Sequence, residues 1–393
     1  MKFYNYFSLN ILLFLVTFTL PMFMGLNNVV LGIYLVCVIF NSYRNKSRPN
    51  WKHLKGYLPI FLFFVLAFIA SVNNTHTFFL KHLESYWSFL LIPIAFGLQQ
   101  EAPKELIKYA FKGLIYGCAA TLLICYVNAI FEIIAYNEPW SYFLRWRHLS
   151  HDFTEIADTH PAYLGLFICV STFYLLFRAP EIGKKFKIAF IILFSLGLLQ
   201  LTSRLALFMY VLVFGIYFVS KATNLKKQLG LFIVFIGIAI SLFFSFGSDY
   251  LKERLFTVQS IEKDGRFERL QVSYDIFKEY PVFGIGFDKI DTLRVEKYTE
   301  HGYIVAAHYK YNAHNQFMEY LSVNGIIGGL IYVLVFGYLV IIALKQKDYL
   351  FLFVILTFFM ANITESMMVR IKGIEYFALF VSLFLNKQLI HKA

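Results

Sequence analysis

Three short stretches of this sequence carry ionisable side chains whose types and placement suit chemistry. His314 in "NAHNQFMEY" lies where a polar segment becomes an apolar run, and Arg204 in "QLTSRLALF" lies at a tight turn between two apolar runs. Arg266 and Arg269 in "DGRFERLQ" are three residues apart, so on a helix they share one face. Guanidinium groups bind phosphate oxygens in a bidentate geometry, and imidazole exchanges a proton near neutral pH. These residue types could therefore bind an anionic leaving group and deprotonate a nucleophile.

Each of these residues also has a purely structural interpretation. Arg204 can extend its charge to the membrane interface while its stem stays among apolar groups. Arg266 and Arg269 can belong to a solvated helix face that neighbouring carboxylates neutralise. His314 can simply bond a loop carbonyl. The residue types alone leave both interpretations open.

The stretch that begins with His314 is expected to be the start of a helix. Asn312 is a possible N-cap for it, because a side-chain amide oxygen can accept from a free N–H of the first turn. A helix N-terminus disfavours imidazolium, which keeps a neutral imidazole available as a base. Further along, Gly325 and Gly329 form a small-xxx-small pair, which predicts close packing against another helix.

A second histidine-containing stretch, "RWRHLSHDFTEIADTHPAY", could be a metal site or a polar loop. It contains no tight ligand motif such as HExxH. We therefore expect a polar acceptor-binding loop without metal, ending at His160, where the following Pro161 begins the next apolar helix. The chain also lacks a P-loop, a G-x-S-x-G elbow and a GxGxxG motif. These absences argue against ATP-driven, serine-hydrolase and dinucleotide-dependent chemistry, and no cofactor is expected.

Long apolar runs must position these residues. The chain has 393 residues, of which 59% are hydrophobic and 15% are charged. Its apolar runs have about the 18 to 25 residues that cross a bilayer, and they lack the alternation of barrel strands. The sequence predicts an all-α polytopic membrane protein with about twelve transmembrane helices. The expected spans are residues 8–24, 27–42, 57–73, 86–99, 110–134, 161–178, 187–201, 203–220, 229–247, 317–343, 348–363 and 373–387.

The distribution of basic residues predicts the orientation of these helices. Lys and Arg are concentrated in one set of alternating loops and at both termini, and they are sparse in the opposite set. By the positive-inside rule, both termini lie in the cytoplasm and the candidate residues face the other side of the membrane. The first apolar run is not followed by a small-residue cleavage site, so we interpret it as a membrane helix and not as a removed signal.

Two outer segments, residues 135–160 and 248–316, are too long to be plain connectors. They divide the chain into residues 1–247 with helices one to nine, the large loop 248–316 between helices nine and ten, and residues 317–393 with helices ten to twelve. Within the large loop, apolar residues spaced three, four and three positions apart predict an amphipathic helix over residues 265–279. These residues are Phe267, Leu270, Tyr274 and Phe277. The sequence "EYPVFGIGF" then predicts a turn.

Three motifs in this order resemble those of the O-antigen ligase and O-antigen polymerase superfamily of bacterial membrane glycosyltransferases. "TSRLALF" resembles the family's Ser-Arg turn between two central helices. "GRFERLQVSYDIFKEYPVFGIGF" resembles its Gly-Arg loop helix that ends in Pro-x-x-Gly-x-Gly. "HNQFMEYLSVNGIIGGLIYV" resembles its His-Asn helix that closes with Gly-Ile/Leu-x-Gly, and "THPAYLG" resembles a His-Pro-x-Tyr stretch of some relatives. The predicted layout, with a large periplasmic loop before the third-last helix, is similar as well.

The resemblance implies a reaction and a set of roles. A glycan carried on undecaprenyl diphosphate at the periplasmic face of the bacterial inner membrane is transferred to an acceptor hydroxyl, which in ligases belongs to a lipid A-core sugar. The resemblance implies His314 and Arg266 as catalytic residues, and Arg204 and Arg266 as ligands of the diphosphate, with Arg269 as the rival loop arginine. It implies His160 and Asn315 as acceptor-binding or supporting residues. No metal, cofactor or nucleic acid is implied.

Other functions remain open at this stage. Polymerases of the same superfamily join lipid-linked repeat units, and some relatives glycosylate protein Ser or Thr. A transporter or flippase would place ionisable residues near mid-membrane, whereas Glu132, Glu319 and Glu375 fall near the ends of predicted helices. A purely structural scaffold would leave the placement of Arg204 unexplained. We therefore favour a ligase-like glycosyltransferase.

Overall fold

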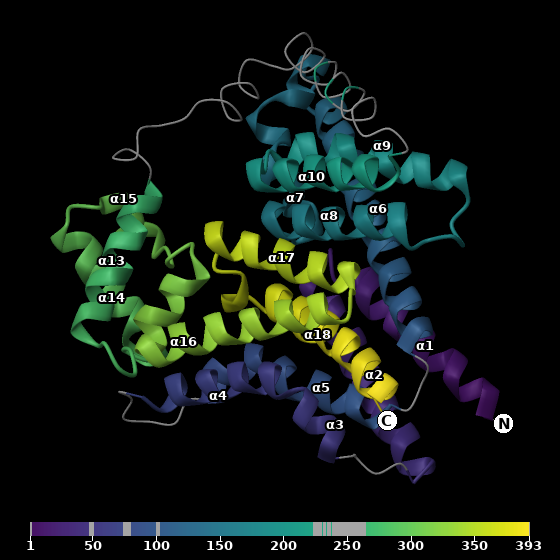
Figure 1. Ribbon diagram of the computed structural model, residues 1–393. Coiled ribbons are helices and arrows are strands. Elements are labelled where there is room, and N and C mark those ends of the chain that lie inside the picture. The colour runs from purple at the N-terminus through teal and green to yellow at the C-terminus, as the bar shows by residue number, and fades with distance from the viewer. Residues whose placement is uncertain are drawn as a thin grey trace. The chain divides into compact units, whose positions relative to one another are not determined.

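The computed structural model describes residues 2–46, 51–73, 80–99, 103–222 and 265–392, together with the single positions 230, 233 and 237. Within these residues every regular element is an α-helix or a short 3-10 helix (Figure 1). The chain packs into two compact units. The first unit comprises Met1–Asn10, Gly32–Ile107 and Gln259–Ala393, and the second comprises Ile11–Leu31 and Lys108–Val258.

The first unit holds the last third of the chain together with helices from its beginning. Its helices are most of α2 (Met24–Arg44), α3 (Trp51–Gly56), α4 (Leu58–Val72), η1 (Leu80–Trp87), α5 (Ser88–Leu98), α13 (Gly265–Glu279), α14 (Phe287–Glu300), α15 (Ile304–Tyr309), α16 (Gln316–Lys345), α17 (Tyr349–Thr364), η6 (Met367–Val369) and α18 (Ile371–Lys392). Aromatic side chains fill its membrane helices. The ring centroid of Phe63 in α4 lies 5.6 Å from that of Phe89 in α5 and 5.5 Å from that of Phe377 in α18.

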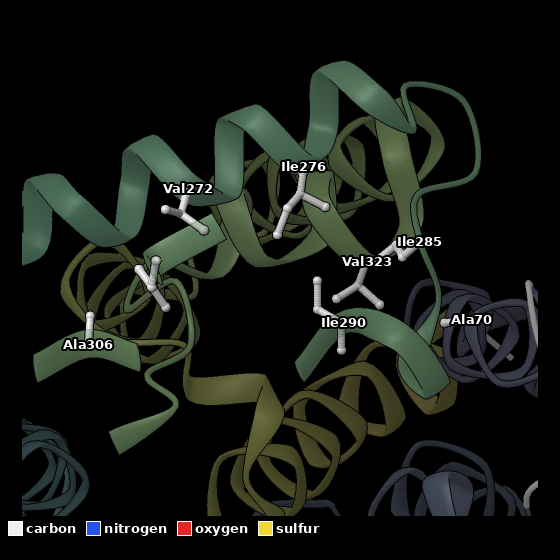
Figure 2. Close-up of a cluster of buried hydrophobic side chains, with 8 residues drawn as sticks. Ala70, Val272, Ile276, Ile285, Ile290, Ala306 and Val323 are labelled. Carbon is white, nitrogen blue, oxygen red and sulfur yellow. The ribbon is translucent and has the colours of Figure 1, made fainter. Parts of the chain in front are cut away.

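Helices α13, α14 and α15 gather at the N-terminal end of α16 (Figure 1). The predicted loop helix is confirmed, because α13 spans Gly265–Glu279. The face predicted to be buried was wrong, because Phe267 and Tyr274 are about half exposed whereas Val272 and Ile276 are buried. Figure 2 shows Val272 and Ile276 on the side of α13 that faces Ile285 and Val323. The three-four-three spacing of apolar residues identified the helix, but which of its faces is buried depends on the residues that pack against it.

The turn after α13 interlocks with a break in α16. Inside α16, Gly325 has φ +66° and interrupts the helix. The carbonyls of Ser322 and Val323 accept from the N–H groups of Ile285 (3.1 Å) and Gly286 (3.0 Å), and the N–H of Ile326 donates to the carbonyl of Pro281 (2.8 Å). The helix therefore exchanges part of its own ladder for hydrogen bonds to the turn, which satisfies both backbones.

The glycines at this crossing are required by close backbone approach. A Cβ on Gly325 would lie 2.3 Å from the carbonyl oxygen of Val282, and a Cβ on Gly284 would lie 2.2 Å from the carbonyl carbon of Val323. Both glycines have positive φ, a backbone conformation that is unfavourable for residues with a Cβ. The prediction that another helix packs closely against Gly325 and Gly329 was therefore wrong. Gly325 accommodates a loop, and a Cβ on Gly329 would meet Leu321 and Phe317 of its own helix.

The second unit contains the helices around the shorter outer segment. They are α1 (Lys2–Thr19, from Ile11 on), α6 (Pro103–Ala135), η2 (Trp140–Leu144), η3 (Trp146–His148), α7 (Ser150–Thr154), η4 (Glu155–Ala157), α8 (Pro161–Phe177), α9 (Lys184–Leu201) and α10 (Arg204–Ser220). Here a small-xxx-small pair does pack two helices. A Cβ on Gly113 or Gly117 of α6 would lie 2.2 Å from the backbone oxygen of Phe14 or Phe18 in α1.

The helix pattern agrees with a membrane protein. Among the described residues, α2, Lys104–Ala135 and α16 are long and apolar enough to cross a membrane, and Ser150–Ala157 with Pro161–Phe177 form a further candidate bent by 80°. Several shorter apolar helices coincide with other expected spans, including α4, α10 and α17. Apart from positions 230, 233 and 237, the expected ninth helix, residues 229–247, falls outside the described residues, as does the first part of the large loop. The count of twelve and the position of the loop therefore stay predictions.

Candidate active site around His314

A six-residue connection delivers His314 to the start of α16. Helix α15 ends at Tyr309, and His314 itself adopts a left-handed backbone conformation with φ +45°. The Asn312 side chain accepts from the N–H of His314 (3.0 Å), while Asn315 caps α16 by accepting from the N–H of Met318 (3.0 Å). Asn312 as N-cap was therefore wrong. Because α16 begins at Gln316 with Asn315 as its N-cap, His314 lies just before the helix.

The nearest charged partner of His314 is Glu365. The Nδ1 atom of His314 lies 2.9 Å from Oε2 of Glu365, and both side chains are about one-fifth exposed. Glu365 follows α17 in an extended conformation, and its N–H donates to the carbonyl of Ala361. A carboxylate at Nδ1 fixes the tautomer and the ring orientation and leaves Nε2 as a proton acceptor. Sequence reasoning missed Glu365, although it is the acidic residue in a short polar break between two apolar runs.

An aromatic ring connects His314 to the large-loop helix. The Tyr311 ring is perpendicular to the His314 ring at a centroid distance of 5.7 Å. The guanidinium carbon of Arg269 lies 4.2 Å from the centroid of the same tyrosine, a cation–π geometry. Burial raises the pKa of Tyr298 to about 12, and its hydroxyl donates to the Tyr311 carbonyl (3.2 Å). The structure thus brings Arg269 toward His314 through Tyr311, whereas Arg266 is an exposed residue at the start of α13.

A buried ion pair fixes the residue that precedes His314. Nη2 of Arg294 lies 2.7 Å from Oε1 of Glu319, and the two side chains are 4% and 8% exposed. The other oxygen of Glu319 accepts from the N–H of Ala313 (3.1 Å). Removing one partner of such a pair leaves a buried charge uncompensated. Arg294 and Glu319 therefore act on His314 through the backbone, and sequence analysis had assigned no role to Arg294.

These residues surround a pocket of about 540 Å³ that lies within the first unit. We call it the His314 pocket. Its wall is formed by residues of α4, η1, α14, α16, η6 and the connection 309–314, and it includes His314, Arg294 and Glu319. Two further cations, Lys310 and Arg370, complete this wall. The pocket brings together a histidine, a buried ion pair and several hydrogen-bonding groups at the end of the membrane helices.

The second unit holds the other two predicted residues. Arg204 is exposed at the first position of α10, directly after the Ser203 N-cap, so the expected turn between α9 and α10 is confirmed. His160 is the N-cap of α8, and its Nδ1 accepts from the N–H of Ala162 (3.2 Å). Within the described part of the chain, no three His, Cys, Asp or Glu side chains are grouped as metal ligands would be.

The fold and the pocket define a class. The chain is a helical membrane protein in which α13 and α14 pack against the broken helix α16, and a polar pocket lies beside a His–Glu pair. Residues 188–333 match the family model described as O-antigen ligase. This match agrees with the resemblance of three sequence motifs to the O-antigen ligase and polymerase superfamily. The matched range contains Arg204, both loop arginines and His314, and no curated protein matches the chain.

Proposed function

We propose that this protein is an O-antigen ligase-like glycosyltransferase that moves a glycan from undecaprenyl diphosphate to a hydroxyl of a lipid A-core sugar. The His314–Glu365 pair beside a polar pocket, in a chain whose residues 188–333 match the O-antigen ligase family model, is the observation that supports it. The reaction takes place at the periplasmic face of the bacterial inner membrane, both termini are cytoplasmic, and no metal takes part.

His314 supplies the base in the proposed mechanism. The acceptor hydroxyl donates a hydrogen bond to Nε2, and its proton moves to that nitrogen as the oxygen attacks the anomeric carbon. The bond from the anomeric carbon to the diphosphate oxygen breaks, and the lipid diphosphate leaves with the electron pair. Glu365 stabilises the imidazolium that forms, because its carboxylate is 2.9 Å from Nδ1. Direct displacement inverts the configuration of the anomeric carbon.

Arginines stabilise the charge that develops on the leaving diphosphate. Arg266 and Arg269 lie one turn apart on α13, and Arg269 is the one that contacts Tyr311. Arg204 belongs to the second unit, and its assignment to the diphosphate rests on the Ser-Arg motif. Asn315 acts as a positioning residue for Glu365. Its amide donates to the carbonyl of Ile363 (3.1 Å), two residues before Glu365.

His160 keeps its proposed supporting role in acceptor binding on the basis of the His-Pro-x-Tyr resemblance. Its ring lies 4.3 Å from that of His151, which is exposed. The Nδ1 atom of His160 accepts from the backbone of α8.

A transfer assay tests the proposal. The purified full-length protein is reconstituted into proteoliposomes with lipid-linked glycan and lipid A-core, and the rate of transfer is measured. We expect His314→Ala to reduce the rate about 10²- to 10⁴-fold, the usual contribution of a general base. His301→Ala is the matched control, because His301 also faces a carboxylate, at 3.0 Å from Asp275, on α13. Full activity of folded His314→Ala protein would exclude the mechanism.

A polymerase would use the same chemistry with a second lipid-linked repeat unit as acceptor. Deletion of the gene separates the two functions. Unattached lipid-linked polymer accumulates after loss of a ligase, and single repeat units accumulate after loss of a polymerase. If the protein instead transfers the glycan to a protein Ser or Thr, deletion of the gene should leave both glycan profiles unchanged, and the glycosylated form of that acceptor protein should disappear.

A further inference from the structure

The His314 pocket has more binding groups than a general base needs. Its volume of about 540 Å³ falls in the range of about 300 to 1,000 Å³ for small-molecule sites. The base itself occupies one part of the wall. The remaining wall has an aromatic side, a hydrogen-bonding side and a positively charged side, and these three sides together indicate a ligand class.

Tyr309 and Tyr311 form the aromatic side. Their rings are stacked at a centroid distance of 5.6 Å and an interplanar angle of 20°. Tyr309 is 63% exposed, whereas Tyr311 is held by the Arg269 guanidinium and by the hydrogen bond from Tyr298. An aromatic face carries partial negative charge, so it attracts the polarised C–H groups on one face of a pyranose ring. A fixed, partly exposed aromatic pair beside a base is therefore suited to a sugar ring.

Asn312 and Asp291 supply hydrogen-bonding groups on the same wall. The oxygen of Asn312 accepts from the N–H of His314, and within the described part of the chain its NH₂ group has no acceptor. The Asp291 side chain is 77% exposed and lies 3.9 Å from Nη1 of Arg294. An amide donor and a carboxylate acceptor can each bond a sugar hydroxyl.

The positive side consists of Lys310 and Arg370. Arg294 is neutralised by Glu319, at 2.7 Å. Lys310 and Arg370 also line the pocket, both are exposed, and neither forms an ion pair with a described residue. Lys310, at the C-terminal end of α15, has φ +50°, a backbone conformation that residues other than glycine seldom adopt. Two uncompensated cations at one wall favour a ligand that carries a carboxylate or phosphate.

We propose that the His314 pocket binds an acceptor sugar that carries an anionic group, with its ring on Tyr309 and Tyr311 and its anionic group on Lys310 and Arg370. This assignment rests on the proposed role of His314 as base, because the base must face the acceptor hydroxyl. The described loop arginines Arg266 and Arg269 are not part of the pocket wall, which favours the acceptor over the lipid diphosphate as its occupant.

Binding of small probes to the full-length protein in nanodiscs tests this site without catalysis. The probes are methyl glucoside, its 6-phosphate and methyl glucuronide, measured by saturation-transfer NMR and calorimetry. We expect the two charged probes to bind at least about 10-fold more tightly than the neutral one, with a difference that shrinks as salt screens the charges. The phosphate and the carboxylate probe then show which anionic group is preferred.

Variants connect the binding to the residues named. Combined Lys310→Gln and Arg370→Gln should remove the preference for charged probes, and Tyr309→Ala should weaken all three probes. Lys278→Gln is the control, because Lys278 is an exposed cation of α13 paired with Asp275 at 2.7 Å, outside the pocket. An unchanged charge preference in the double variant would overturn the proposal.

Two competition experiments give further ways to overturn it. If inorganic phosphate binds as tightly as the sugar phosphate and Tyr309→Ala has no effect, the pocket is only an anion site. If geranyl diphosphate displaces the probes, the pocket holds the donor and not the acceptor. The variant His314→Ala separates this proposal from the mechanism. Probe binding should persist in that variant while transfer is lost. Persistent transfer would contradict the role of His314 as base but not the binding site.

Discussion

His160 and His314 occupy similar places in the sequence and very different places in the structure. Each histidine ends a polar outer segment and precedes an apolar helix, α8 or α16. The Nδ1 atom of His160 accepts from the N–H of Ala162, two residues away. The Nδ1 atom of His314 instead faces Glu365, 51 positions later in the chain. A histidine before a membrane helix can thus accept a hydrogen bond from the backbone of that helix, or it can pair with a distant carboxylate in the wall of a pocket.

The largest expected effect comes from removing that carboxylate. Glu365→Gln keeps the shape of the side chain but removes the charge that stabilises the imidazolium, so kcat should fall about 10²-fold or more with little change in the KM for acceptor. The pH–rate profile should change as well, because the base loses its charged partner. His160→Ala should leave that profile intact. An identical profile for Glu365→Gln and the unmodified protein would remove Glu365 from the mechanism.

Glu319→Gln should have the next largest effect, this time on stability as well. It leaves the buried Arg294 without its counter-charge, and such a loss costs about 3 to 5 kcal/mol. Thermal unfolding in detergent measures the change. The double variant Arg294→Met with Glu319→Leu removes both charges and should recover most of the stability, while transfer stays low because Ala313 loses its acceptor. Recovery of transfer together with stability would contradict a positioning role.

His160 should respond to substitution as a helix cap responds. His160→Ala removes the acceptor for the Ala162 N–H and should cost about 1 kcal/mol of stability, whereas His160→Asn keeps a capping oxygen and should cost less. The same pair of substitutions at His314 should abolish transfer in both cases. The proposed role of His160 in acceptor binding predicts that transfer falls in both variants, and full transfer by His160→Asn would leave His160 with the role of a cap alone.

The smallest effect is expected at the exposed pair Asp275–His301. Burial alone would raise the pKa of Asp275, but hydrogen bonds from Lys278 and His301 outweigh it and hold this pKa below its usual value. A lowered pKa in the folded state contributes stability above the unfolded pKa, near 3.9, and this contribution is lost as the pH falls through the folded pKa.

Acid unfolding therefore tests this pair. Asp275→Asn should remove a small pH dependence below about pH 4, of the size typical for exposed pairs, and should leave transfer unchanged. A large loss of transfer in Asp275→Asn would mean that any histidine–carboxylate pair in this unit affects the reaction, and that the pair at His314 is not special.

The fold was predictable from the sequence to a greater extent than the site. Apolar runs and turn residues located the described membrane helices and α13 closely, because helix formation in a membrane depends on local composition. His314 and the loop arginines could be identified from residue type and order. Glu365, Arg294 and the pairing with Glu319 could not, because each depends on which helices pack together. Asn312 was misassigned for the same reason: two asparagines flank His314, and only the structure shows which one caps the helix.

The interlocked turn has a practical consequence for engineering. The segment from Pro281 to Gly286 exchanges backbone hydrogen bonds with α16, so its length is set by the helix and one inserted residue would shift every bond. The turn at Gly302 is different, because it is exposed and a Cβ there would meet nothing within 4 Å. An epitope or fluorophore inserted at Gly302 should be tolerated, and its accessibility in whole cells would report the membrane sidedness of the His314 pocket.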